Sequence, residues 1–291
     1  MAKISTNERL RYGERVAGYR QAVDELLKKE KETLSHIRAE KEDSSMIQIA
    51  LAEDMLNLAS NYIILSGVSN AVVGVRNEEA LNDARKSLYK CVIYLEGVLG
   101  NYVDAPFSDY EDKLARIAPL DAAGRYLLVR KLGLAIQLLK DAYGDHSKWK
   151  WSFVELEGRF AAAAKNIMDL KKASANTDPR SPEYEPTVYL LRLIKKLLSQ
   201  AADRYRERYE LSTKSIEDLK MGIRFLSALR RIQSLVGNRN EVEVTKKKMD
   251  VWESKLFADS KKNRESTLKK IRDDQSGRQE PDEDEEEFEF E

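Results

Sequence analysis

The chain has 291 residues, of which 42% are hydrophobic and 34% are charged, and its 50 basic residues balance its 50 acidic residues. Gly and Pro together contribute only 19 residues, roughly half of the usual share. This shortage of turn-forming residues argues against sandwiches, barrels and doubly wound sheets, and it favours an all-α protein of long helices.

The first 105 residues contain no proline and carry apolar residues at helical spacing. A first helix is predicted from about Thr6 to Asp43, and a second begins near Met46 with Ser44 or Ser45 as its N-cap. The segment Met55–Val75 is uncharged and long enough to cross a bilayer, but its Asn and Ser residues are unfavourable in hydrocarbon. We therefore expect a buried central helix of a bundle and no membrane span.

Four further helices are predicted before residue 176. One starts near Asn77 and carries Cys91 on its apolar stripe, where a small core residue is expected rather than a nucleophile. The others cover about 108–117, 119–143 and 147–175, and glycines or prolines mark several of their ends. Together with the first two, these helices predict an antiparallel multi-helix bundle.

The last of these helices opens with Lys148-Trp149-Lys150-Trp151. Basic residues between aromatic residues can form a stacking platform for single-stranded nucleic acid. The alternative, which we favour, is that the Trp rings pack on the bundle while the lysines face water.

Three prolines fall within residues 176–186, so this stretch cannot be the interior of a helix. It predicts an N-terminal helical bundle at 1–178, a Pro-rich linker at 179–186 and a coiled-coil-like region at 187–272. Residues 273–291 are expected to be a disordered acidic tail.

The most regular apolar pattern follows the linker, with steps of three and four residues that are typical of a heptad seam. A single helix over 187–236 would be about 75 Å long. Alternatively, the chain turns near Leu211-Ser212-Thr213 and forms a hairpin. Gly237-Asn238 ends this region, and a last helix is predicted over about 240–273. The seam consists of Leu191, Ile194, Leu198, Ala201, Tyr205, Tyr209, Ser212, Ile216, Leu219, Ile223 and Leu226.

The charge is distributed unevenly. Residues 273–291 contain eleven acidic residues and one arginine, so the tail has a formal charge of −10 and the remainder +10. Such a tail can be purely solubilising, or it can fold back on the basic body as a mimic of nucleic acid. We prefer a third interpretation, in which Phe288 and Phe290 anchor an acidic-aromatic segment in a partner groove.

Two pairs of basic residues are aligned on the predicted helices after the linker. Arg192 with Lys196, and Lys220 with Arg224, are like-charged neighbours at i,i+4. They are candidate contacts for an acidic or phosphate-bearing partner, although a charged face on a heptad helix is usually only solvated.

The residues that several kinds of site would require are missing from the sequence. One cysteine excludes an intramolecular disulfide, and two histidines leave no His-rich zinc or ferritin-type di-iron pattern. Phosphate-loop, dinucleotide and calcium-loop motifs do not occur. We therefore expect no cofactor and no metal. The mixed charge of the N-terminal segment is unlike a secretory signal and favours the cytoplasm.

These observations favour a non-enzymatic structural or interaction protein, a scaffold or adaptor. It would act through helix–helix contacts, including self-association, and through its acidic-aromatic tail. The alternative is a nucleic-acid-associated protein whose basic body is autoinhibited by the tail. An enzyme using groups near Asn57, Asn61 and Tyr62 is a third hypothesis, for which the spacing offers no reaction type.

Overall fold

The computed structural model describes residues 5–39, 43–144 and 147–276, except for the side chains of 266–276. Within these ranges the chain forms ten α-helices and no strand, which confirms the all-α prediction. The helices are α1 (Thr6–Ala39), α2 (Ser45–Val73), α3 (Glu78–Leu99), α4 (Glu111–Ala115), α5 (Ala122–Tyr143), α6 (Lys150–Asn166), α7 (Leu170–Ala175), α8 (Tyr184–Arg208), α9 (Ile216–Leu235) and α10 (Arg239–Ser276).

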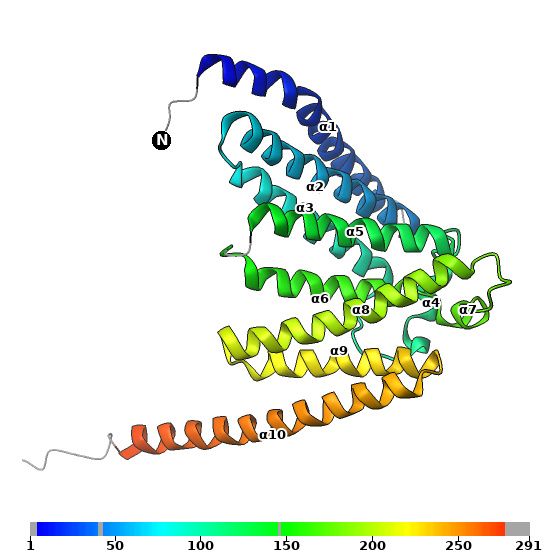
Figure 1. The fold of residues 1–291 in the computed structure, drawn as a ribbon, viewed down its shortest axis with the longest axis vertical. Helices are drawn as coiled ribbons and strands as arrows, with labels where there is room; N and C mark the ends of the chain where they lie inside the picture. The colour runs from blue at the N-terminus through cyan, green and yellow to red at the C-terminus, as the bar shows by residue number, and fades with distance from the viewer. Residues whose placement is uncertain (1–4, 40–42, 145–146, 277–291) are drawn as a thin grey trace, which may run out of the picture.

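The long helices lie roughly side by side in a row, with α1 at one end and α10 at the other (Figure 1). Neighbours in the chain pack on each other in the pairs α1–α2, α2–α3, α8–α9 and α9–α10. The middle of the row is joined by α5, which contacts α2, α3 and α8, and by α6, which contacts α3 and α8. One hydrophobic core therefore runs from Val16 in α1 to Trp252 in α10.

Side-chain caps set several helix ends. The Asn77 carboxamide oxygen accepts a hydrogen bond from the N–H of Ala80, as the sequence pattern predicts for the start of α3. Asp121 caps α5 in the same way, so this helix begins after the predicted start at Pro119. The helix predicted over 147–175 is divided into α6 and α7, because Asp169 caps a new helix.

α2 is the one helix among the described residues that is long and apolar enough to cross a membrane. It packs between α1 and α3, and its first half, up to Ala59, is mostly buried. The segment Met55–Val75 as a whole was expected to be buried, and most of it is not. The second half of α2 is more open than expected. However, its exposed positions are mostly polar or small, as for Asn57, Ser60 and Gly67. The absence of a membrane span stays a prediction.

The Pro-rich segment is shorter than predicted, because α8 already begins at Tyr184 and includes Pro186 in its first turn, where proline is tolerated. α8 packs directly on α5 and α6, so core residues from both sides of the linker lie in the same cluster. The division into separate domains stays a prediction. The tail was also predicted to start too early, since α10 continues through residues 273–276.

The chain after the linker turns back on itself. A π-helical turn at Tyr209–Thr213 follows α8, Lys214 adopts a left-handed conformation with φ 52°, and α9 returns along α8. The hairpin alternative is therefore the one that the structure adopts. Most residues of the seam are buried inside the chain, while Ser212 is exposed at the turn. Because α8 uses the seam against its own neighbours, the seam does not present a free surface to a second chain.

Candidate docking groove

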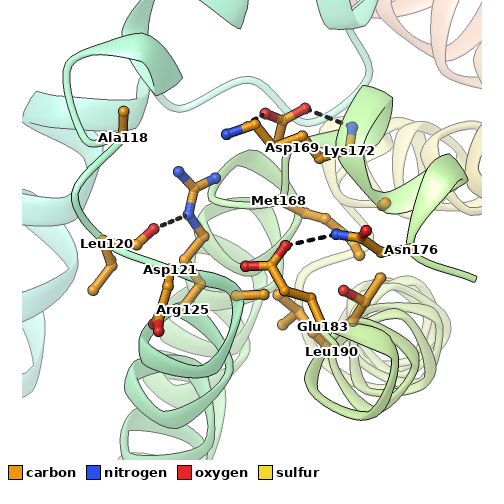
Figure 2. Close-up of a pocket in the computed structure, with 13 residues that line it drawn as sticks. Ala118, Leu120, Asp121, Arg125, Met168, Asp169, Lys172, Asn176, Glu183 and Leu190 are labelled. Atoms are coloured by element: carbon orange, nitrogen blue, oxygen red, sulfur yellow. Dashed lines mark hydrogen bonds and ion pairs between the residues drawn. The ribbon is translucent and has the colours of Figure 1, made fainter. Parts of the chain in front are cut away.

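One hollow in the described surface is a cavity of about 130 Å³ beside Arg125, with both polar and apolar lining residues (Figure 2). The Arg125 side chain is 5% exposed and donates hydrogen bonds to three main-chain carbonyl oxygens. These belong to Leu120 at 2.8 Å, Ile167 at 3.0 Å and Ile117 at 3.2 Å. The guanidinium thus connects the segment before α5 to the end of α6.

The positive charge of Arg125 at this cavity is balanced by nearby carboxylates, so the cavity does not offer a free cation to a bound anion. Burial lowers the pKa of the Arg125 guanidinium, and the nearby carboxylates of Asp169 and Glu183 counteract this effect. Asp169 already caps α7, and Glu183 accepts a hydrogen bond of 2.7 Å from Asn176 (Figure 2). We interpret the cavity as a structural junction in which Arg125 satisfies carbonyl groups that have no helical partner.

The second hollow is an apolar groove of about 580 Å³ between α5 and α8, with α6 beneath it. We call it the α5–α8 groove. Leu134 of α5 lines it with a side chain that is 59% exposed, and Leu193 and Leu197 of α8 line it from the other side. Its remaining large apolar lining residues are Val129, Ile136 and Phe160.

The depth of the groove depends on Gly133. A Cβ atom at this position would lie 3.2 Å from the Phe160 ring, so the glycine lets α6 contribute its aromatic ring to the floor. Beyond the groove, Leu127 and Leu138 of α5 and Tyr189 of α8 are 45–46% exposed. Apolar surface on both helices thus extends past the groove itself. Such convergence of exposed apolar side chains marks interaction surfaces more than scattered exposure does.

The acidic residues at the groove are already paired. Glu157 forms ion pairs with Lys140 and with Arg204, and Asp203 forms one of 2.6 Å with Lys248 of α10. The cations Arg130 and Lys196 also line the groove, and within the described residues neither forms an ion pair with a carboxylate. The groove therefore combines an apolar floor with free positive charge at its rim.

The structure separates the four basic residues that the sequence singled out. Lys196 lines the groove and Arg192 lies one helical turn earlier on α8, both with exposed side chains. Lys220 and Arg224 lie on α9 and do not line it, and Lys220 is bonded to Glu217 at 2.7 Å. Phe288 and Phe290 lie outside the described residues, so their role stays a prediction.

Several other cations that suggested a phosphate-binding face are used inside the fold. On α8 and α9, ion pairs join Lys195 to Glu241, Arg206 to Glu210, Arg208 to Asp218 and Arg231 to Asp104. The rings of Trp149 and Trp151 are partly buried against the core, as the favoured interpretation expected, rather than forming an open stacking platform. Arg85 covers Trp149 at 4.1 Å from the ring centroid, and Lys150 covers Trp151 at 4.8 Å. The faces covered by these cations are therefore not open to bases.

A buried amine lies on the opposite edge of α6. Lys165 is 3% exposed, and its Nζ lies 3.4 Å from the Tyr110 hydroxyl and 4.5 Å from that ring's centroid. Burial lowers its pKa to about 8, and the more distant Asp104 counteracts this only in part. Lys165 lines neither the Arg125 cavity nor the α5–α8 groove, and we interpret it as a core residue that packs against Tyr110.

The groove was missed by sequence reasoning, although a signal for it exists. Leu127, Leu134 and Leu138 fall outside the main apolar stripe of α5, and Tyr189, Leu193 and Leu197 form a second stripe on α8 beside the seam. Apolar residues off the core stripe indicate a second packing surface. Which two stripes face each other could not be read from the sequence, because it depends on how α5 and α8 pack.

The fold and the groove together define an all-α protein with an apolar, positively rimmed surface groove. The chain belongs to the TP0443 family, whose model matches residues 8–260. This span includes the groove and ends before the acidic tail. Comparison with curated proteins and with solved structures gives no match. Within the described residues, no group of three or more His, Cys, Asp or Glu side chains is placed to hold a metal ion.

Proposed function

We propose that this chain is a non-enzymatic interaction protein, a scaffold or adaptor of the cytoplasm, that holds an apolar segment of a protein partner in the α5–α8 groove. The observation that carries the proposal is the exposure of Leu134 at 59% opposite the second apolar stripe of α8. An extended or helical segment with large apolar residues would bury these side chains. Acidic residues beside them would meet Arg130 and Lys196.

The docking site proposed here differs from the one that the sequence favoured. The heptad seam is used within the chain, so helix–helix contact with a partner falls instead to the surface of α5 and α8. The alternative of nucleic-acid binding has less support, because ion pairs occupy many of the cations on α8 and α9.

A selection from a random peptide library tests the proposal on the full-length protein. We expect the selected peptides to combine apolar residues with acidic neighbours. Leu134→Asp should abolish their binding, because it places a charge in the apolar groove without disturbing a buried side chain. The matched control is Phe257→Asp, at a residue of α10 that is 75% exposed and does not line the groove.

Either of two results would overturn the proposal. One is the absence of any enrichment on the wild-type protein. The other is binding that Leu134→Asp and Phe257→Asp affect equally. A short nucleic-acid duplex that binds with steep salt dependence, while no peptide is selected, would favour the nucleic-acid hypothesis instead.

A further inference from the structure

The groove and the C-terminal tail have complementary chemistry. Residues 280–291 contain nine acidic residues and end in Phe-Glu-Phe-Glu, so that Phe288 and Phe290 are the large apolar side chains of an otherwise anionic segment. The groove offers the counterpart, since exposed Leu134 and partly buried Leu193 and Leu197 line it together with the cations Arg130 and Lys196. Aromatic anchors in an apolar pocket contribute most of the affinity of such contacts, and surrounding charges accelerate association.

The path of α10 decides which copy of the tail can reach the groove. Lys248 of α10 binds Asp203, a residue of α8 that lines the groove. From Lys248, α10 continues for 28 residues to Ser276, whose position is about 42 Å farther along the axis. Figure 1 shows this part of α10 extending past the ends of α8 and α9.

To reach the groove of its own chain, the tail would have to be fully extended. Phe288 follows Ser276 by 12 residues, which span at most about 40 Å when fully extended. This length brings Phe288 back only to the level of Lys248, and the distance across α8 to Leu134 would still remain. Full extension is entropically unfavourable. A second molecule has no such restriction, because it can approach the end of α10 from any side.

We propose that the α5–α8 groove binds the acidic-aromatic tail of a second copy of this chain, with Phe288 and Phe290 against the leucines and the carboxylates against Arg130 and Lys196. This inference rests on the proposed function and names the partner. The contact joins two different surfaces, so each copy that donates its tail still offers a free groove. Association is therefore head to tail, and it continues into rings or chains.

The experiment measures self-association of the full-length chain by sedimentation velocity across a concentration series. We expect concentration-dependent growth beyond a dimer, weakened by salt. Leu134→Asp disables the groove, and Phe288→Ser with Phe290→Ser disables the tail. Each variant alone should weaken association by at least about 10-fold. A mixture of the two variants should form a 1:1 complex and nothing larger, because only one functional contact remains.

Charge variants provide a matched control. Lys196→Glu at the groove should weaken association, whereas Lys246→Glu, an exposed change of the same sign on α10, should leave it unchanged. Equal effects of the two variants would mean that only net charge matters and would overturn the proposal. A wild-type protein that stays monomeric at all concentrations would overturn it as well.

A synthetic peptide of residues 277–291 separates the remaining outcomes. The full-length tail variant, whose groove is intact, should bind this peptide, and Leu134→Asp introduced into that variant should abolish the binding. A peptide that binds while the wild-type protein stays monomeric would place the tail in its own groove and refute docking between copies. If this peptide fails but library-selected peptides bind, the groove keeps its proposed function and the tail is not its partner.

Discussion

Replacement of Lys165 by methionine should stabilise the protein at pH 7. The lysine amine is 3% exposed, and among the described residues its one hydrogen-bond partner is the Tyr110 hydroxyl. Burial lowers its pKa from the ordinary value of 10.5 to about 8. Keeping this amine protonated inside the fold at pH 7 therefore disfavours the folded state by about 3 kcal/mol. Methionine has a similar length and no charge to desolvate.

The gain should be smaller than this figure, because the ammonium also interacts with the face of the Tyr110 ring at 4.5 Å. A contact of this kind contributes about 1 kcal/mol. We therefore expect Lys165→Met to raise the free energy of unfolding by about 2 kcal/mol. Lys246→Met, at an exposed lysine of α10, is the control and should change stability little.

The wild-type protein should also become more stable between pH 8 and pH 10. In this range the unfolded chain keeps the proton of Lys165 and the folded chain loses it, so the free energy of unfolding rises with pH. Above pH 10 the opposite effect begins, because burial raises the pKa of Tyr110 to about 12 and favours its protonated form in the fold. Lys165→Met should lack the contribution between pH 8 and pH 10.

Urea unfolding of the wild type, Lys165→Met and Lys246→Met at pH 7, 8, 9 and 10 measures both effects. A Lys165→Met variant that is less stable than the wild type at pH 7 would refute the reasoning. So would an identical pH dependence of the two proteins, because the buried amine could then not be the group that titrates.

Three further predictions concern other parts of the fold. Arg125→Met should lower the free energy of unfolding by about 3 kcal/mol, because the carbonyl oxygens of Leu120 and Ile167 lose their donor and that of Ile117 keeps only the Leu120 N–H. Chemical denaturation measures the loss, and a neutral result would contradict the junction role. Gly158→Ala should destabilise by about 1–3 kcal/mol, since its Cβ would lie 2.6 Å from the Tyr205 ring. Gly67→Ala, with nothing within 4 Å, should instead raise the melting temperature, and calorimetry of both variants tests the contrast. Cys91 is fully buried, and burial raises the pKa of its thiol. A thiol reagent should therefore modify it only after unfolding. Rapid modification of the native protein would instead show that α3 opens readily.

Much of the local structure follows from the sequence because it depends on short-range chemistry. The start of α3 was predicted near Asn77 because Glu78 and Glu79 suit the positive end of the helix dipole. The structure adds that the Asn77 side chain caps this helix by accepting a hydrogen bond from a backbone N–H only three residues away. The regular 3–4 spacing after residue 187 predicts that Leu191 and Ile194 are buried, and they are. Cys91 is buried on its stripe for the same reason.

Errors in the predicted boundaries also have local causes. Proline at position 186 suggested a linker, but a proline in the first turn of a helix removes an N–H that has no helical partner in any case. Asp169 was not recognised as a cap, so α6 and α7 were predicted as one helix.

The sequence by itself determined that the chain is helical, where most of its helices lie and which stripe of each is apolar, because these depend on residue spacing and caps. Only the tertiary structure decided what each stripe contacts. It turned the chain at Tyr209–Thr213, so that the seam is used inside the molecule, and it left Leu134 and Leu193 facing a groove. It also placed Lys196 at the groove and Lys220 away from it. Residues that share a pattern along the chain come together only when their helices pack with those faces toward each other.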